Sequence, residues 1–124
     1  MKTSETVDVF GRLADDKKAL DIVIMDLSGL TDIADYFVIA SGTSERHVRT
    51  IADGIREGMK QEETKPSVVE GYDQGRWIIL DYQNVIVHIF LGSLRELYDL
   101  ESLWIEAKRH RVKKENKNIE VGNE

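Results

Sequence analysis

Two short apolar runs most constrain the fold of this chain: residues 76–81 and 85–90 lie on either side of a polar loop. Both are rich in β-branched and aromatic residues, which favours strands. A turn at Gln83 and Asn84 would join them as an antiparallel hairpin, and loops of two or four residues give the same register. That register pairs Trp77 with Phe90, Ile78 with Ile89, Ile79 with His88, Leu80 with Val87 and Asp81 with Ile86. A loop of odd length would instead move the side chains of one strand to the other face.

The hairpin would present two different surfaces, because side chains alternate between the faces of a sheet. One face is aliphatic and carries Ile78, Leu80, Val85, Val87 and Ile89. The other face is mixed and carries Trp77, Ile79, Asp81, Ile86, His88 and Phe90. A core disfavours an unpaired Asp and His, and a solvent-facing surface disfavours Trp and Phe. We therefore expect helices over the aliphatic face and a protein interface on the mixed face.

The remaining sequence predicts three helical segments and three further strands. Helices are expected from Val7 to about Lys18, from Ser44 to a stop at Pro66, and from Ser93 onward; strands are expected at residues 22–25, 36–41 and 68–69. A strand, a helix and a strand in succession imply a parallel crossover, whereas the hairpin is antiparallel. We therefore predict a single α/β (α+β) domain, with a mixed sheet of about five strands and helices mainly on one face.

Charge is distributed unevenly along the chain. Residues 1–107 hold 11 Lys/Arg and 20 Asp/Glu, a net charge of −9, whereas residues 108–124 hold 6 and 3, a net charge of +3. We therefore divide the chain into one domain (1–107) and a basic, flexible C-terminal tail (108–124). An acidic body disfavours broad contact with nucleic acid and favours a basic partner protein, while the tail keeps a minor contact with RNA possible.

The lack of cysteine and of long apolar segments excludes several kinds of functional site and of protein. The chain has no cysteine, which excludes disulfides, thiolate nucleophiles and Cys-ligated metals. No apolar run approaches the ~20 residues of a membrane span, and the N-terminus lacks the apolar core of a signal peptide. We expect a cytoplasmic protein with no membrane segment.

The sequence Gly42-Thr43-Ser44, between a strand and a helix, is the strongest enzymatic signal. Backbone N–H groups at a helix N-terminus suit a phosphate, and nucleotidyltransferases place a Gly-Ser pair similarly. Such enzymes also need two or three convergent carboxylates for metal ions. Asp81 is one candidate, but no predicted strand carries an Asp-x-Asp pair. An ordinary helix cap is therefore favoured over a metal-dependent nucleotidyltransferase.

The other polar candidates have structural or interface explanations. His88 has no second His or Cys at ligand spacing, so we predict no metal site and interpret it as an interface or hydrogen-bonding residue. Arg95, Tyr98, Glu101 and Trp104 recur every three residues. Either the two aromatic residues pack on the sheet edge, with Arg95 and Glu101 as a weak surface pair, or at least one aromatic residue contacts a partner.

Several of these motifs together, in this order, resemble the Iojap-related ribosomal silencing factors, over residues 19–107. The run from Asp35-Tyr36 to Gly42-Thr43-Ser44, the two hairpin strands and the Arg95–Trp104 series carry the resemblance. The positions matched to the family motif are Asp35, Tyr36, Gly42, Ser44, Tyr82 and Arg95. The chain departs from the family pattern at Gln83-Asn84, where a turn containing glycine is expected.

The resemblance implies a nucleotidyltransferase-like topology without its catalytic carboxylates, and no cofactor, metal or turnover. It implies a factor that binds the large ribosomal subunit through large-subunit ribosomal protein fourteen, blocks subunit joining and represses translation when nutrients are scarce. It also implies a homodimer when free. Combined with the mixed sheet face, it gives the candidate partner-binding residues Trp77, Ile79, Asp81, His88, Phe90, Tyr98, Glu101 and Trp104. A nucleotidyltransferase and a bare homodimeric scaffold are the alternatives.

Overall fold

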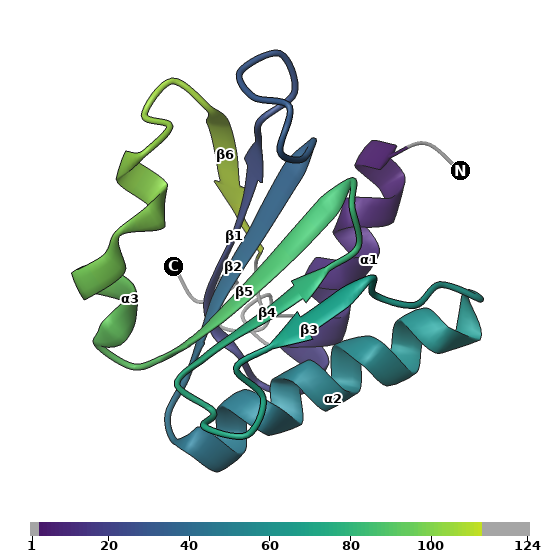
Figure 1. Cartoon of the computed structure of the whole chain (residues 1–124), viewed down its shortest axis with the longest axis vertical. Helices are drawn as coiled ribbons and strands as arrows, with labels where there is room; N and C mark the ends of the chain where they lie inside the picture. Colours follow the sequence, from purple (N-terminus) through teal and green to yellow (C-terminus); the bar gives the residue numbers. More distant parts are fainter. Residues whose placement is uncertain (1–2, 113–124) are drawn as a thin grey trace, which may run out of the picture.

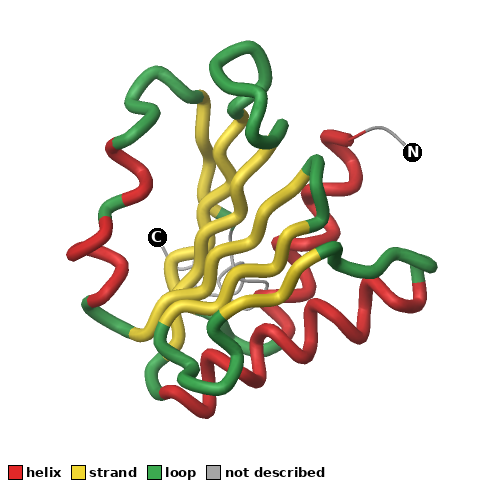
Figure 2. Tube along the Cα trace, viewed as in Figure 1, coloured by secondary structure: helices red, strands yellow, loops and turns green. Residues whose placement is uncertain are grey.

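The computed structural model describes residues 3–112, which form one six-stranded sheet with helices on both faces (Figure 1). The helices are α1 (Thr3–Asp16), α2 (Glu45–Gln61), α3 (Leu94–Tyr98) and the 3-10 helix η1 (Leu100–Ser102). The strands are β1 (Leu20–Asp26), β2 (Tyr36–Gly42), β3 (Val68–Glu70), β4 (Trp77–Asp81), β5 (Val85–Leu91) and β6 (Lys108–Arg111). Their order is β3-β4-β5-β2-β1-β6 (Figure 2), and only β2 and β5 are parallel neighbours. The predicted mixed α/β domain is confirmed, with six strands instead of about five.

The β4–β5 hairpin has the predicted register, from Trp77 opposite Phe90 to Asp81 opposite Ile86. Gln83 adopts a left-handed conformation with φ of 74°, and its N–H donates to Asp81 Oδ1 at 2.8 Å. This local bond stabilises the turn without the expected glycine. The aliphatic face of the hairpin lies in the larger core, beneath α1 and α2, as predicted.

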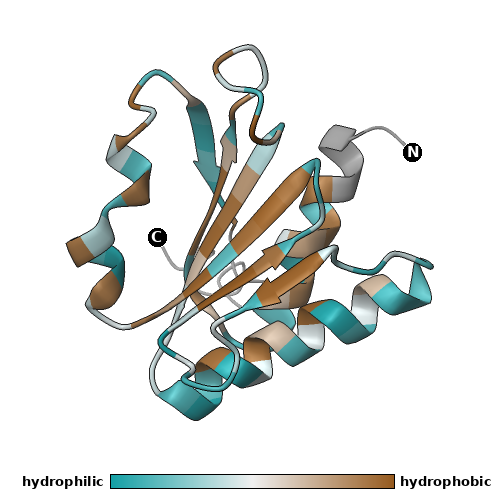
Figure 3. Cartoon of the chain, in the orientation of Figure 1, coloured by the Kyte–Doolittle hydropathy of each residue, from teal (hydrophilic) through white to brown (hydrophobic). Residues whose placement is uncertain are grey.

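Helix α2 contributes an apolar stripe to that core, and Ser44 caps its start as expected. The Ser44 hydroxyl accepts a hydrogen bond from the His47 N–H at 3.0 Å. The buried residues of the helix are Val48, Ile51, Ala52, Ile55 and Met59. Its outward side is polar, whereas β4 and β5 are largely apolar (Figure 3). No helix within residues 3–112 has both the length and the apolar character needed to cross a membrane.

Strand β6 corrects the predicted boundary between the domain and the tail. Residues 108–111 were expected in the tail, but they pair antiparallel with β1, with Asp26 opposite Lys108 and Val23 opposite Arg111. All four β6 side chains are exposed, so the sequence has no apolar alternation to reveal the strand. The next residue, Val112, packs against the larger core. The rest of the predicted tail, 113–124, lies outside the described residues.

Candidate partner-binding surface

The mixed face of the hairpin forms a second, smaller core together with β1 and β2. Phe90 is completely buried and His88 is 6% exposed. These two candidate residues therefore support the mixed face from within the protein. Trp77, Ile79 and Asp81 on β4 are half-buried. The predicted separation of an aliphatic face from a mixed face is therefore present in the structure, but the mixed face is not open to solvent throughout.

Residues 94–107, here called the cover segment, shield part of this mixed face. Leu94, Leu100 and Trp104 point toward the smaller core, and Trp104 meets Phe37 edge-on with ring centroids 5.3 Å apart. Tyr98 lies over Trp77 at a centroid distance of 4.5 Å. Both predicted aromatic residues of the cover segment thus pack against the sheet, as one of the two sequence interpretations proposed.

The outer side of the cover segment exposes large apolar side chains. Leu97 is 73% exposed, Leu103 64% and Ile105 82%, and Tyr98 is half exposed as well. Sequence reasoning missed the first three, because the segment is mostly turns and short helices and has no apolar period to assign them to a face. Grouped exposed apolar residues on an anchored segment are typical of a protein-binding surface.

Arg95 fastens the cover segment to the sheet. Its side chain is buried and makes a two-pronged contact with Glu101, with Nε donating to Oε1 at 3.1 Å and Nη2 to Oε2 at 3.3 Å. Its Nη1 donates to the backbone oxygen of Asp21 and, at 3.1 Å, to Ser41 Oγ. The interpretation of Arg95 and Glu101 as a weak surface pair is therefore wrong, because this guanidinium links three parts of the chain.

Arg109 adds a second fastening from β6. Its Nη1 donates to the Glu101 carbonyl at 3.1 Å, and its Nη2 donates to the Trp104 carbonyl at 2.6 Å. A side chain on the edge strand therefore orders the backbone of the cover segment, where few regular backbone hydrogen bonds are available.

His88 is held in one neutral tautomer by Trp77. The indole N–H of Trp77 donates to His88 Nδ1 at 3.1 Å, so the ring proton resides on Nε2, which is buried without a hydrogen-bond partner. Burial lowers the pKa of His88 from its ordinary value of 6.5 to about 4. His88 thus supports Trp77 from beneath as a neutral group at physiological pH.

This burial makes the free energy of unfolding depend on pH. The unfolded chain binds a proton at His88 before the folded chain does, so stability present above pH 6.5 is lost as the pH falls toward 4. At pH 5.5 the loss attributable to His88 is about 1 kcal/mol. Urea unfolding of wild type and His88→Gln at pH 7.5 and 5.5 measures it, because glutamine can accept the Trp77 N–H without titrating. An equal pH dependence of both proteins would contradict the assignment.

The loop at Gly42-Thr43-Ser44 is occupied by the protein's own hydrogen bonds. His47 Nδ1 accepts from the Thr43 N–H at 2.9 Å, and His47 Nε2 donates to the Lys17 carbonyl at 2.9 Å. A Cβ at position 42 would lie 2.9 Å from Val48 Cγ2, so a glycine is needed for close packing there. The predicted helix cap is confirmed. Residues 3–112 contain no group of three or more His, Asp or Glu side chains arranged to hold a metal ion.

Of the remaining motif positions, Tyr36 and Tyr82 lie on the side of the sheet that α1 and α2 cover, and Asp35 lies in the loop before β2. Tyr82 meets Phe10 edge-on at 4.8 Å, and burial raises the pKa of its hydroxyl to about 12. Tyr36 packs on the larger core. The backbone N–H of Asp35 donates to the Asn84 carbonyl at 2.9 Å and ties the start of β2 to the hairpin turn. These positions therefore support the fold.

Comparison with known proteins gives consistent matches over most of the chain. The family model described as "Ribosomal silencing factor during starvation" matches residues 1–123. "Ribosomal silencing factor RsfS" of Bacillus subtilis is 35% identical over 107 residues, covering 86% of this chain and 91% of that protein. The mouse "Mitochondrial assembly of ribosomal large subunit protein 1" is 33% identical over 101 residues, covering 79% of this chain and 44% of that protein.

Two crystal structures share the fold. One, of a protein from Chromobacterium violaceum, has a TM-score of 0.81 and 31% identity, covering 84% of this chain and 87% of that one. The other, from Bacillus halodurans, has a TM-score of 0.76 and 32% identity, covering 90% and 99%.

Proposed function

This chain belongs to the ribosomal silencing factor family, and from that premise we propose that it binds the large ribosomal subunit and represses translation by keeping the subunits apart. The proposed contact is with large-subunit ribosomal protein fourteen, at the surface where the small subunit would join. The mechanism is steric, and it requires no cofactor and no chemical turnover.

The exposed apolar side of the cover segment is the observation that carries this proposal. Leu97, Leu103 and Ile105 project outward from a segment whose inner side is already anchored, so binding would bury them without unfolding the protein. Tyr98 packs on Trp77 and presents an aromatic anchor that is already oriented. The half-buried candidates Ile79, Asp81, Glu101 and Trp104 are proposed to complete the contact.

Charge supports a basic partner. Residues 94–107 hold four carboxylates against one arginine, and that arginine is buried against Glu101. Glu96, Asp99 and Glu106 remain exposed among the apolar side chains. Proteins that bind ribosomal RNA are rich in Lys and Arg, so an acidic and apolar patch complements them.

The direct test is sedimentation through a sucrose gradient with purified ribosomal subunits. We expect the protein to migrate with the large subunit and to reduce the fraction of assembled ribosomes in proportion to its occupancy. Adding it after assembly should have a smaller effect, because the joined small subunit already covers the proposed site. Migration with the small subunit, or undiminished assembly at full occupancy, would refute the steric mechanism.

We further propose that free molecules form the homodimer that the family resemblance implies, and that they pair through the same apolar surface. Ribosome binding and self-association would then compete for the cover segment. The proposed minor RNA contact rests on the exposed basic residues of β6, Lys108–Arg111, since the rest of the predicted tail is outside the described residues.

A further inference from the structure

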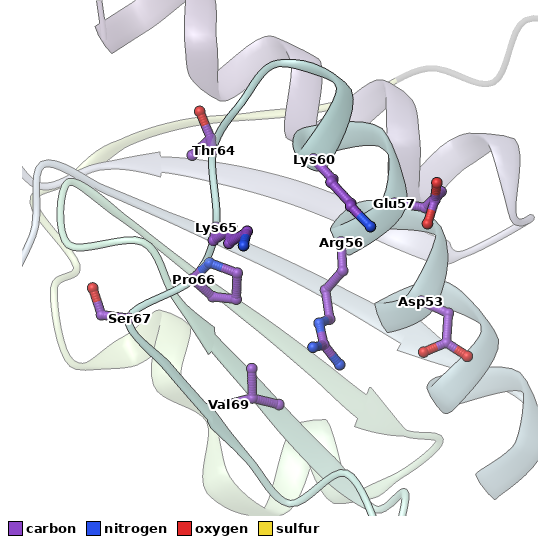
Figure 4. Close-up of a pocket in the computed structure, with 9 residues that line it drawn as sticks. All are labelled: Asp53, Arg56, Glu57, Lys60, Thr64, Lys65, Pro66, Ser67 and Val69. Atoms are coloured by element: carbon purple, nitrogen blue, oxygen red, sulfur yellow. The ribbon is translucent and has the colours of Figure 1, made fainter.

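A hollow separates the C-terminal half of α2 from the segment that leads into β3 (Figure 4). Its volume is about 520 Å³, and its floor includes Pro66 and Val69. This α2–β3 hollow lies at the β3 edge of the sheet, whereas the cover segment packs on the face opposite α2. Its chemistry is therefore independent of the proposed ribosome-binding surface.

Three basic side chains line the hollow. Arg56 and Lys60 lie one turn apart on α2, and Lys65 comes from the facing segment (Figure 4). Within residues 3–112 none of the three forms an ion pair or a side-chain hydrogen bond. Arg56 and Lys60, one helical turn apart, repel each other, and Asp53 and Glu57, each three residues before one of them on α2, offset part of this repulsion.

The acidic residues of the hollow lie beside Lys60 and leave Arg56 and Lys65 uncovered. Asp53 and Glu57 lie on the side of α2 that points away from Val69, while the Arg56 guanidinium extends toward Val69 (Figure 4). Asp53 also accepts a hydrogen bond from the Tyr72 hydroxyl at 2.9 Å. The α2 wall of the hollow thus carries both signs of charge: the Lys60 ammonium points toward Glu57, whereas the Arg56 guanidinium extends away from both carboxylates (Figure 4).

We propose that the α2–β3 hollow binds a phosphate group. The Arg56 guanidinium supplies a planar pair of donors that matches two phosphate oxygens, and Lys60 and Lys65 supply mobile point charges around it. The volume exceeds that of a phosphate alone and falls in the range of small-molecule sites, so it admits a nucleotide unit. That unit could belong to an RNA backbone or to a free nucleotide.

Binding measurements on the isolated protein test the proposal. The probes are inorganic phosphate, adenosine monophosphate and a single-stranded RNA of ten nucleotides, titrated by calorimetry at low salt. We expect at least one probe to bind, and Arg56→Gln with Lys65→Gln to weaken that binding by about tenfold or more. Arg46→Gln with Lys18→Gln is the matched control, with the same chemistry and charge change at exposed positions outside the hollow, and should change affinity by less than about twofold.

The outcomes separate the two sources of phosphate. Tight, salt-dependent RNA binding with weak mononucleotide binding identifies an RNA backbone, and equal or tighter mononucleotide binding identifies a free nucleotide. Failure of all three probes, or equal losses in the hollow and control variants, overturns the proposal. Circular dichroism melts verify folding, and both variants should fold because every replaced side chain is exposed. No ribosome is present in this assay, so either result leaves the proposed function unaffected.

Discussion

Replacing Leu97 and Ile105 together with lysine should reduce affinity for the large ribosomal subunit by about 100-fold or more. Both side chains are largely exposed, 73% and 82%, and neither contributes to a core. The change removes two apolar anchors and places positive charge opposite a basic partner. Because the positions are exposed, the free energy of unfolding should change by less than about 0.5 kcal/mol.

The matched control places the same two charges on the helix side of the molecule. Thr50→Lys with Gln61→Lys, both exposed on α2, changes the net charge equally but leaves the cover segment intact. Sedimentation binding assays with the large subunit compare the two variants. Equal affinities would show that the ribosome contacts another face, and the cover segment would then lose its proposed role.

Arg95→Met should lower the free energy of unfolding by about 3 kcal/mol, because it leaves the Glu101 carboxylate and the Asp21 carbonyl without their shared partner. Its effect should extend to function. Loss of this fastening releases the cover segment, so large-subunit affinity should fall even at temperatures where the sheet stays folded. Urea unfolding and hydrogen exchange of residues 94–107 report the two effects separately.

Two companion variants distinguish the geometry of Arg95 from its charge. Arg95→Lys keeps the positive charge but lacks the planar guanidinium. It should therefore restore only part of the free energy of unfolding that Arg95→Met loses. Glu101→Gln keeps a hydrogen-bond acceptor and should cost less than Arg95→Met. Full stability in Arg95→Met would contradict the fastening role.

The hairpin shows what could be predicted from the sequence. Its register and its two faces follow from local alternation, and the structure confirms both. The apolar stripe of α2 is likewise encoded within the helix itself. These features depend on neighbours a few residues apart, where periodicity is a direct signal.

The cover segment shows where the sequence was insufficient. The burial of Arg95 depends on Asp21 and Ser41, which are distant in sequence and carry no pattern that links them to it. The outward direction of Leu97 and Ile105 depends on how irregular turns dock on the sheet. Strand β6 was missed for a related reason, because its four polar side chains resemble a solvated tail and its pairing relies on the backbone.

The composition of β6 also affects how concentrated solutions of this protein behave. Within the described residues β6 is one of the two edge strands of the sheet, and its exposed side chains are Lys108, Arg109, His110 and Arg111. An open sheet edge is a template for aggregation, since a strand from another molecule can extend it. Two such edges approaching each other bring basic side chains together, and the repulsion opposes fibre-like stacking. At the opposite edge, β3 has only three residues and offers little backbone to extend. Since exposed charges are screened by salt, protection at the β6 edge should be strongest at low ionic strength.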